Sequence, residues 1–234
     1  MERRSVGRLG AAAMAIALAA CAGGQKQETA KAPEVNQDWL ARVPPEGMAP
    51  VDEARAAQRQ QEDEANRAAV ARQDAENQVN VSKNEEKAAK AAVGTAEARV
   101  DAAKARGQYT EINEAKAALD NAKLASRVAE AKRQRDEKAA ELARGQEALA
   151  KTRVDTARAQ VSQAEYRALL ATGDARAAEL DPAAFDKAVS DRMARESRAQ
   201  AQVDKQQQGY QAANATYDQL NQQLRASRPA PPAG

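Results

Sequence analysis

The chain has 234 residues, of which 36 are basic and 34 acidic, and it contains no histidine, one cysteine and one tryptophan. Only 3% of the residues are aromatic, 30% are charged and about a quarter are alanine, a composition typical of long helices and coiled coils. The lack of histidine removes the commonest general base and metal ligand, and a single cysteine excludes intrachain disulfides and cysteine-rich zinc sites.

Residues 1–20 have the layout of a secretory signal peptide. Arg3, Arg4 and Arg8 precede a run of small and aliphatic residues that is too short to span a bilayer. The run ends in a Leu-Ala-Ala-Cys motif at Cys21, which resembles the lipobox of bacterial lipoproteins.

The resemblance to the lipoprotein family implies that Cys21 receives a diacylglyceryl thioether, becomes the first residue of the mature chain and is acylated on its amino group. Several acyl chains hold a protein in a bilayer far more firmly than one. Ala22 stands where an aspartate commonly retains such lipoproteins in the inner membrane, so the resemblance favours the outer membrane, facing the periplasm. The alternative is an ordinary signal peptide followed by a single buried cysteine.

Residues 21–50 are expected to form a lipidated, flexible tether. Prolines and glycines between Pro33 and Pro50 oppose a long helix there. Trp39, the only tryptophan, is expected to dock on the end of the helices or at the membrane interface; the alternative is that it contacts a partner.

Residues 51–106 and 110–172 repeat every seven residues, which predicts two long helices. At one of the two seam positions of the first segment nearly every side chain is small: Ala54, Gln61, Ala68, Ala75, Ser82, Ala89, Ala96 and Ala103. Sustained 3-4 spacing indicates a left-handed coiled coil, and alanine lets two helices approach closely, as in the antiparallel packings called Alacoils.

Gly107 follows basic residues of the kind found in a last helical turn, so it predicts a short turn between the two segments. A fold-back at this turn makes the helices antiparallel neighbours. It also sets Arg72 opposite Glu147 and Glu86 opposite Arg133. Because an unpaired charge in a seam is costly, we interpret these residues as ion pairs that set the register.

Residues 181–226 predict a third helix that begins at an Asp-Pro pair. A second apolar stripe on the middle helix would face it. In that arrangement Leu170 lies against Phe185, and Gly145 leaves room for the ring of Tyr210. The alternative is that this stripe packs on another subunit.

The predicted fold is therefore all-α, an elongated antiparallel coiled coil of three long helices with Alacoil-like seams. Residues 227–234 are expected to form a disordered, proline-rich tail. Polar residues dilute the seams and alanine buries little area, so we expect a monomer of modest stability that tends to self-associate.

Motifs for catalysis, metal binding or phosphate binding are not found in the sequence. Acidic pairs such as Glu85-Glu86 fit solvated helix faces, and the glycines are too scattered for a phosphate-binding loop. We expect no enzymatic activity, no metal and no cofactor apart from the covalent lipid on Cys21.

The favoured function is a membrane-anchored, periplasmic scaffolding lipoprotein of the cell envelope. The chain resembles alanine-rich, coiled-coil envelope lipoproteins, whose partners would be other copies, another envelope protein or, without covalent linkage, peptidoglycan. The equal numbers of basic and acidic residues after residue 20 argue against nucleic acid. The alternative is an accessory or adaptor subunit of an envelope transport or efflux complex, which would use the hairpin tip near Gly107.

Overall fold

The computed structural model describes residues 33–227; that range is mostly helical and contains no strand. The predicted signal peptide, Cys21 and all but the first residue of the predicted tail lie outside the described residues. The helices are, in chain order, α1 (Gln37–Leu40), α2 (Pro45–Arg106), α3 (Tyr109–Ala171), the short 3-10 helix η1 (Ala175–Glu179) and α4 (Pro182–Ala226).

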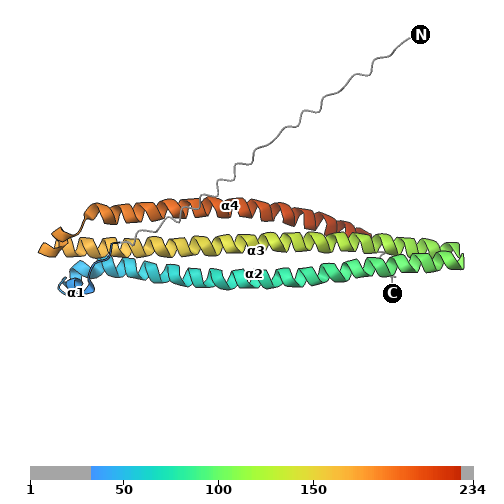
Figure 1. Cartoon of the computed structure of the whole chain (residues 1–234), viewed down its shortest axis with the longest axis horizontal. Helices are drawn as coiled ribbons and strands as arrows, with labels where there is room; N and C mark the ends of the chain where they lie inside the picture. The colour runs from blue at the N-terminus through green and yellow to red at the C-terminus, as the bar shows by residue number, and fades with distance from the viewer. Residues whose placement is uncertain (1–32, 228–234) are drawn as a thin grey trace, which may run out of the picture. The chain divides into compact units, whose positions relative to one another are not determined.

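Three of these helices are long, and they pack side by side (Figure 1). α2 has 62 residues, α3 has 63 and α4 has 45. At about 1.5 Å per residue these lengths correspond to roughly 93, 95 and 68 Å.

The ends of the long helices follow local sequence signals. Gly107 has a φ of 74°, and its N–H donates to the carbonyls of Ala103 and Lys104, closing α2. Asp181 accepts a hydrogen bond from the N–H of Ala183 at 2.9 Å, and Pro182 is the first residue of α4. A left-handed glycine and an Asp-Pro start are common devices at these two positions.

The start of the first long helix differs from the prediction. α2 begins at Pro45 instead of residue 51, so the segment expected to be a flexible tether is ordered and partly helical from residue 33 onward. Pro45 occupies the first helical position, which tolerates proline, but Pro50 lies inside the helix. Because Val51 is completely buried and Met48 packs on the same core, tertiary contacts outweigh the hydrogen bond that Pro50 cannot donate.

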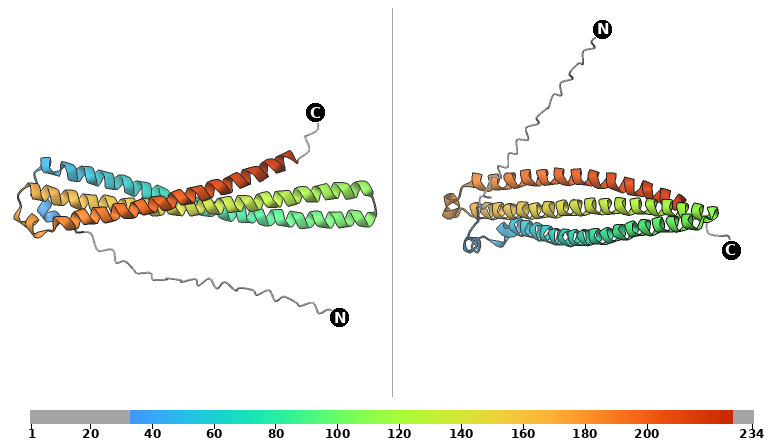
Figure 2. Two further views of the ribbon diagram at one scale, coloured as in Figure 1. Left: turned by 90° about the horizontal axis from the view of Figure 1, so that it is seen from above. Right: turned by 45° about the vertical axis from the view of Figure 1, so that its right-hand side comes forward.

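α3 lies between α2 and α4 (Figure 2). It packs along both partners, whereas α2 and α4 have no pair of Cα atoms within 8 Å of each other in the described part of the chain. The second stripe of α3 faces α4, since Leu142 and Leu149 form a cluster with Val203. The sequence left open whether this stripe packs on the third helix or on another subunit. In the structure it packs on α4 of the same chain.

Large side chains are concentrated at one end of the helices. The main core joins the segment before α2 to the C-terminal part of α3, to η1 and to the start of α4, and it includes Leu40, Tyr166, Leu169 and Phe185. Along the rest of the α2–α3 interface the buried residues are mostly alanine and valine. The strongest hydrophobic packing is therefore at the end of α3 near residue 171.

Two predicted contacts between α3 and α4 are wrong by about one helical turn. Phe185 stacks on Tyr166 with ring centroids 4.8 Å apart, while Leu170 is 53% exposed. Gly145 lies against the side chain of Gln206 instead of the ring of Tyr210.

Gly145→Ala tests this corrected contact. A Cβ at position 145 would overlap with the amide oxygen of Gln206, which is buried without a hydrogen-bond partner. We expect Gly145→Ala alone to change the free energy of unfolding little, because the gain in helix propensity is offset by displacement of Gln206. In a Gln206→Ala background the same change should stabilise by about 1 kcal/mol, the propensity difference between the two residues. Urea unfolding of the four proteins measures this, and equal effects of Gly145→Ala in both backgrounds would contradict the contact.

Candidate functional site

Residues 35–51, which we call the clasp, join the N-terminal side of the chain to three other elements. The side chain of Asn36 caps α1 by accepting from the N–H of Asp38 at 2.9 Å. Four apolar side chains of the clasp are buried in the main core: Val35, Leu40, Val43 and Val51.

A buried carboxylate fastens the clasp to α3. Glu165 is 5% exposed, and its Oε1 accepts from Gln37 at 3.2 Å and from Arg55 at 2.8 Å. Arg55 also donates to Gln37 at 2.9 Å, so the three side chains form a closed triangle. A charge-assisted triangle of this kind fixes the position of α1 against α3 with directional bonds.

Trp39 fastens the clasp to η1. The guanidinium of Arg176 lies over the indole ring, 5.3 Å from its centroid. Asp174 orients this guanidinium by accepting from its Nε at 2.8 Å and from a second guanidinium nitrogen. These hydrogen bonds from Arg176 hold the pKa of the Asp174 carboxyl far below its usual range. Of the placements considered for Trp39, the structure has it docked on the end of the helices.

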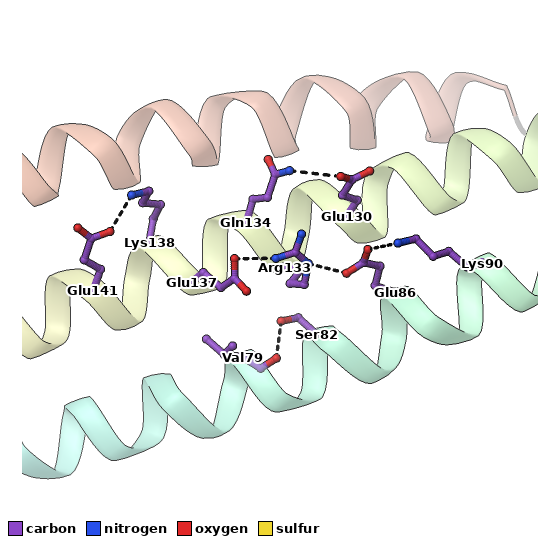
Figure 3. A network of polar contacts seen from close by, with 10 residues as sticks. All are labelled: Val79, Ser82, Glu86, Lys90, Glu130, Arg133, Gln134, Glu137, Lys138 and Glu141. Carbon is purple, nitrogen blue, oxygen red and sulfur yellow. Dashed lines mark hydrogen bonds and ion pairs between the residues drawn. The ribbon is translucent and has the colours of Figure 1, made fainter. Parts of the chain in front are cut away.

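Both ion pairs expected between the first two long helices are present. Arg72 lies 2.6 Å from Glu147, and Arg133 lies 2.5 Å from Glu86. The residue numbers of each pair have the same sum, so the two pairs share one register between α2 and α3. Figure 3 shows Glu86 between Arg133 and Lys90.

Each pair belongs to a larger network. Glu76 accepts hydrogen bonds from Arg72 at 2.7 Å and from Arg144 of α3 at 2.8 Å. Glu137 accepts one from Arg133 at 2.7 Å, as Figure 3 shows. The neighbouring seam residue Ser82 is fully buried and donates to the carbonyl of Val79 at 3.0 Å. The α2–α3 interface thus contains buried polar side chains, among them Ser82 and Glu86, beside its alanines.

The acidic members of these networks predict how stability depends on pH. Bonds from Lys90 and then Arg133 lower the pKa of Glu86, and bonds from Lys151 together with Arg72 lower the pKa of Glu147. A carboxylate with a lowered pKa contributes its full stability above its unfolded-state pKa and loses it as the pH falls through the folded-state value.

Stability should therefore be nearly constant between about pH 6 and 8, where no histidine titrates, and should fall below about pH 4.5. Urea unfolding over this range measures the effect. The control is Glu86→Gln combined with Glu147→Gln, which should flatten part of the decrease. A decrease of the same depth in the control would show that other carboxylates cause it.

The docking of Trp39 on the end of the helices was among the expectations, whereas the bonds of the clasp to Glu165 and Arg176 were not predicted, although one signal for them exists in the sequence. Extending the register of the two ion pairs toward the start of α2 puts Arg55 beside Glu165, one residue from the position directly opposite. The bond from Gln37 to Glu165 and the contact of Trp39 with Arg176 have no such signal, because each joins residues more than 100 positions apart.

Surface hollows in the described range lie between neighbouring helices. One, between α2 and α3, is lined by Glu62, Asn66, Lys151, Asp155 and Arg158. Among residues 33–227, no group of three or more acidic, cysteine or histidine side chains is placed to hold a metal ion. None of the helices described is apolar enough over a sufficient length to cross a bilayer. Comparisons with models of protein families, with curated proteins and with solved structures gave no match.

Proposed function

We propose that the chain is a non-enzymatic scaffolding lipoprotein of the bacterial envelope, anchored through lipids on Cys21 and facing the periplasm. The observation that carries the proposal is the combination of a lipobox-like motif with three long helices packed side by side. Long helices suit a scaffold that spans a distance and contacts other proteins, because their binding surface is spread along their length.

The details of packing that we propose are those of an antiparallel coiled coil with Alacoil-like seams. Support comes from the small residues buried along α2 and α3, among them Ala96, Ala103, Ala150 and Ala157. Alanine at such positions allows close approach of two helices. It also leaves little apolar area per residue, so self-association would add stability.

The position of the clasp is consistent with a membrane anchor. The described structure starts at Pro33, twelve residues after Cys21. A chain spans at most about 3.5 Å per residue, so the anchored end of the helices would stay within roughly 40 Å of the acylated cysteine. The opposite end, near Gly107, would then extend into the periplasm.

Replacement of the cysteine tests the anchor. Cys21→Ser should abolish incorporation of an alkyne-labelled fatty acid and should move the protein from the membrane fraction to the soluble periplasmic fraction. Ala22→Asp is the matched control, because it should keep the label but shift the protein toward the inner membrane. Membrane binding that survives Cys21→Ser would overturn the proposal.

A second candidate function is that of an adaptor or accessory subunit of an envelope transport complex. The observation that favours it is the hairpin tip, where Tyr109 is 77% exposed. α4 ends at Ala226, nine residues after the ring of Tyr217 that contacts Arg135, so it stops well before the tip. A photo-crosslinking residue at position 109 in intact cells separates the candidates: capture of a channel component favours the adaptor, and capture of the same chain or of peptidoglycan favours the scaffold.

A further inference from the structure

The large hydrophobic side chains are not distributed evenly along the helices. The main core combines Trp39 and Leu40 of the clasp with Tyr166, Leu169 and Phe185 at the same end. The only other hydrophobic cluster of buried residues in the described chain consists of Leu142, Leu149 and Val203. The bulkiest packing is thus found at the end where the chain arrives from Cys21.

The clasp contacts several elements at once. Its apolar residues share the core with Leu169 of α3, Ala177 of η1 and Phe185 of α4. Gln37 bonds to Glu165 of α3, and Trp39 contacts Arg176 of η1. A force applied at residue 33 would therefore be shared between the contacts to α3 and η1 and the core that also contains Phe185 of α4.

A helix pair held mainly by alanine resists two kinds of force differently. A force that pulls one helix end away from its partner breaks the contacts one turn after another, so each step meets little resistance. A force shared by many contacts must break them together. The clasp includes the first residues of α2, at the end where stepwise separation from α3 would begin.

We propose that the clasp is a tension-resisting joint, which passes tension from the anchored Cys21 to α3, to η1 and to the core shared with α4, and prevents α2 from peeling off α3. The inference rests on the proposed anchoring at Cys21 for its biological role. The mechanical property itself does not depend on lipidation.

Single-molecule pulling tests the joint on the mature chain, residues 21–234. Because Cys21 is the only native cysteine, a DNA handle can be attached where the lipid would be. The second handle uses a Gln108→Cys substitution, at an exposed residue whose side chain makes no cap hydrogen bond. Under constant force, the first event should be the opening of residues 33–44, up to roughly 40 Å at 3.5 Å per residue. Separation of α2 from α3 should follow without a second long waiting time, because the alanine-rich contacts break one turn after another.

Leu40→Ala and Leu149→Ala form a matched pair, because the two leucines are 5% and 6% exposed and lose the same atoms. Leu40→Ala should shorten the waiting time before the first step by about tenfold or more, or remove the step altogether. Leu149→Ala, in the second cluster, should change that waiting time by less than about twofold. Gln37→Ala keeps the apolar contacts and should shorten it by about threefold.

Equal effects of the two leucine substitutions would overturn the proposal. A long second waiting time, after residues 33–44 have opened and before α2 separates, would also overturn it, because α2 would then stay on α3 without the clasp. Failure of Cys21 to carry lipid would refute the anchor but would leave the pulling result unchanged, so the two proposals can fail separately.

Discussion

Phe185→Ala should lower the free energy of unfolding by about 3–5 kcal/mol, the range for removing a buried aromatic side chain. Phe185 is 1% exposed and stacks on Tyr166, so the substitution removes both packing area and a ring–ring contact. The residue lies four positions into α4 and also touches the core that includes the clasp. The effect should therefore extend to α1 and η1.

Urea unfolding followed by circular dichroism measures the loss, and hydrogen exchange locates it. The control is Met193→Ala, two turns further along α4, where the side chain is 54% exposed. That change should cost less than about 0.5 kcal/mol, as for most surface positions. If both variants lose the same stability, the core at this end does not hold the helices together.

Arg72→Glu should destabilise the protein by about 2 kcal/mol, less than the loss of a fully buried pair because Arg72 is partly exposed. The new carboxylate would face Glu147 on α3 and would have Glu76 one turn away on α2. Three acidic groups would then stand where two carboxylates now share one guanidinium.

A charge-swapped double variant distinguishes an effect on the alignment of α2 and α3 from a general loss of helix stability. Adding Glu147→Arg to Arg72→Glu restores opposite charges across the interface and should recover at least half of the loss. Recovery will be incomplete, because Lys151 now pairs with Glu147 and would repel an arginine there. Thermal unfolding of both single variants and the double variant gives the coupling energy. Additive losses would mean that Arg72 and Glu147 do not set the alignment of α2 and α3.

Sequence reasoning was most accurate where the determining signals are local. The predicted helix boundaries at 106, 110, 172, 181 and 226 lie within one residue of the observed ends. Glycine after a last turn and an Asp-Pro start act over a few residues, so they can be recognised without knowledge of the fold. The two-residue turn at 107–108 also fixes the register of α2 on α3, which explains why the facing charges could be paired in advance.

Errors arose where distant contacts decide the structure. The connection from α3 to α4 is longer and contains η1, so the register of α4 was misjudged by one turn, as Gly145 and Gln206 demonstrate. The prolines at 44, 45 and 50 indicated a flexible segment by local rules. Burial of Val51, together with the bond from Gln37 to Glu165, orders that segment through partners far away in the sequence.

The central position of α3 has a consequence for cooperativity. Because α2 and α4 have no pair of Cα atoms within 8 Å of each other along the described chain, coupling between them should pass mainly through α3 and through the shared core at one end. Substitutions in the two seams far from that core should therefore have independent effects on unfolding. The outer helices can then melt in separate transitions, and heating would produce a partly folded pair of helices before the whole chain unfolds.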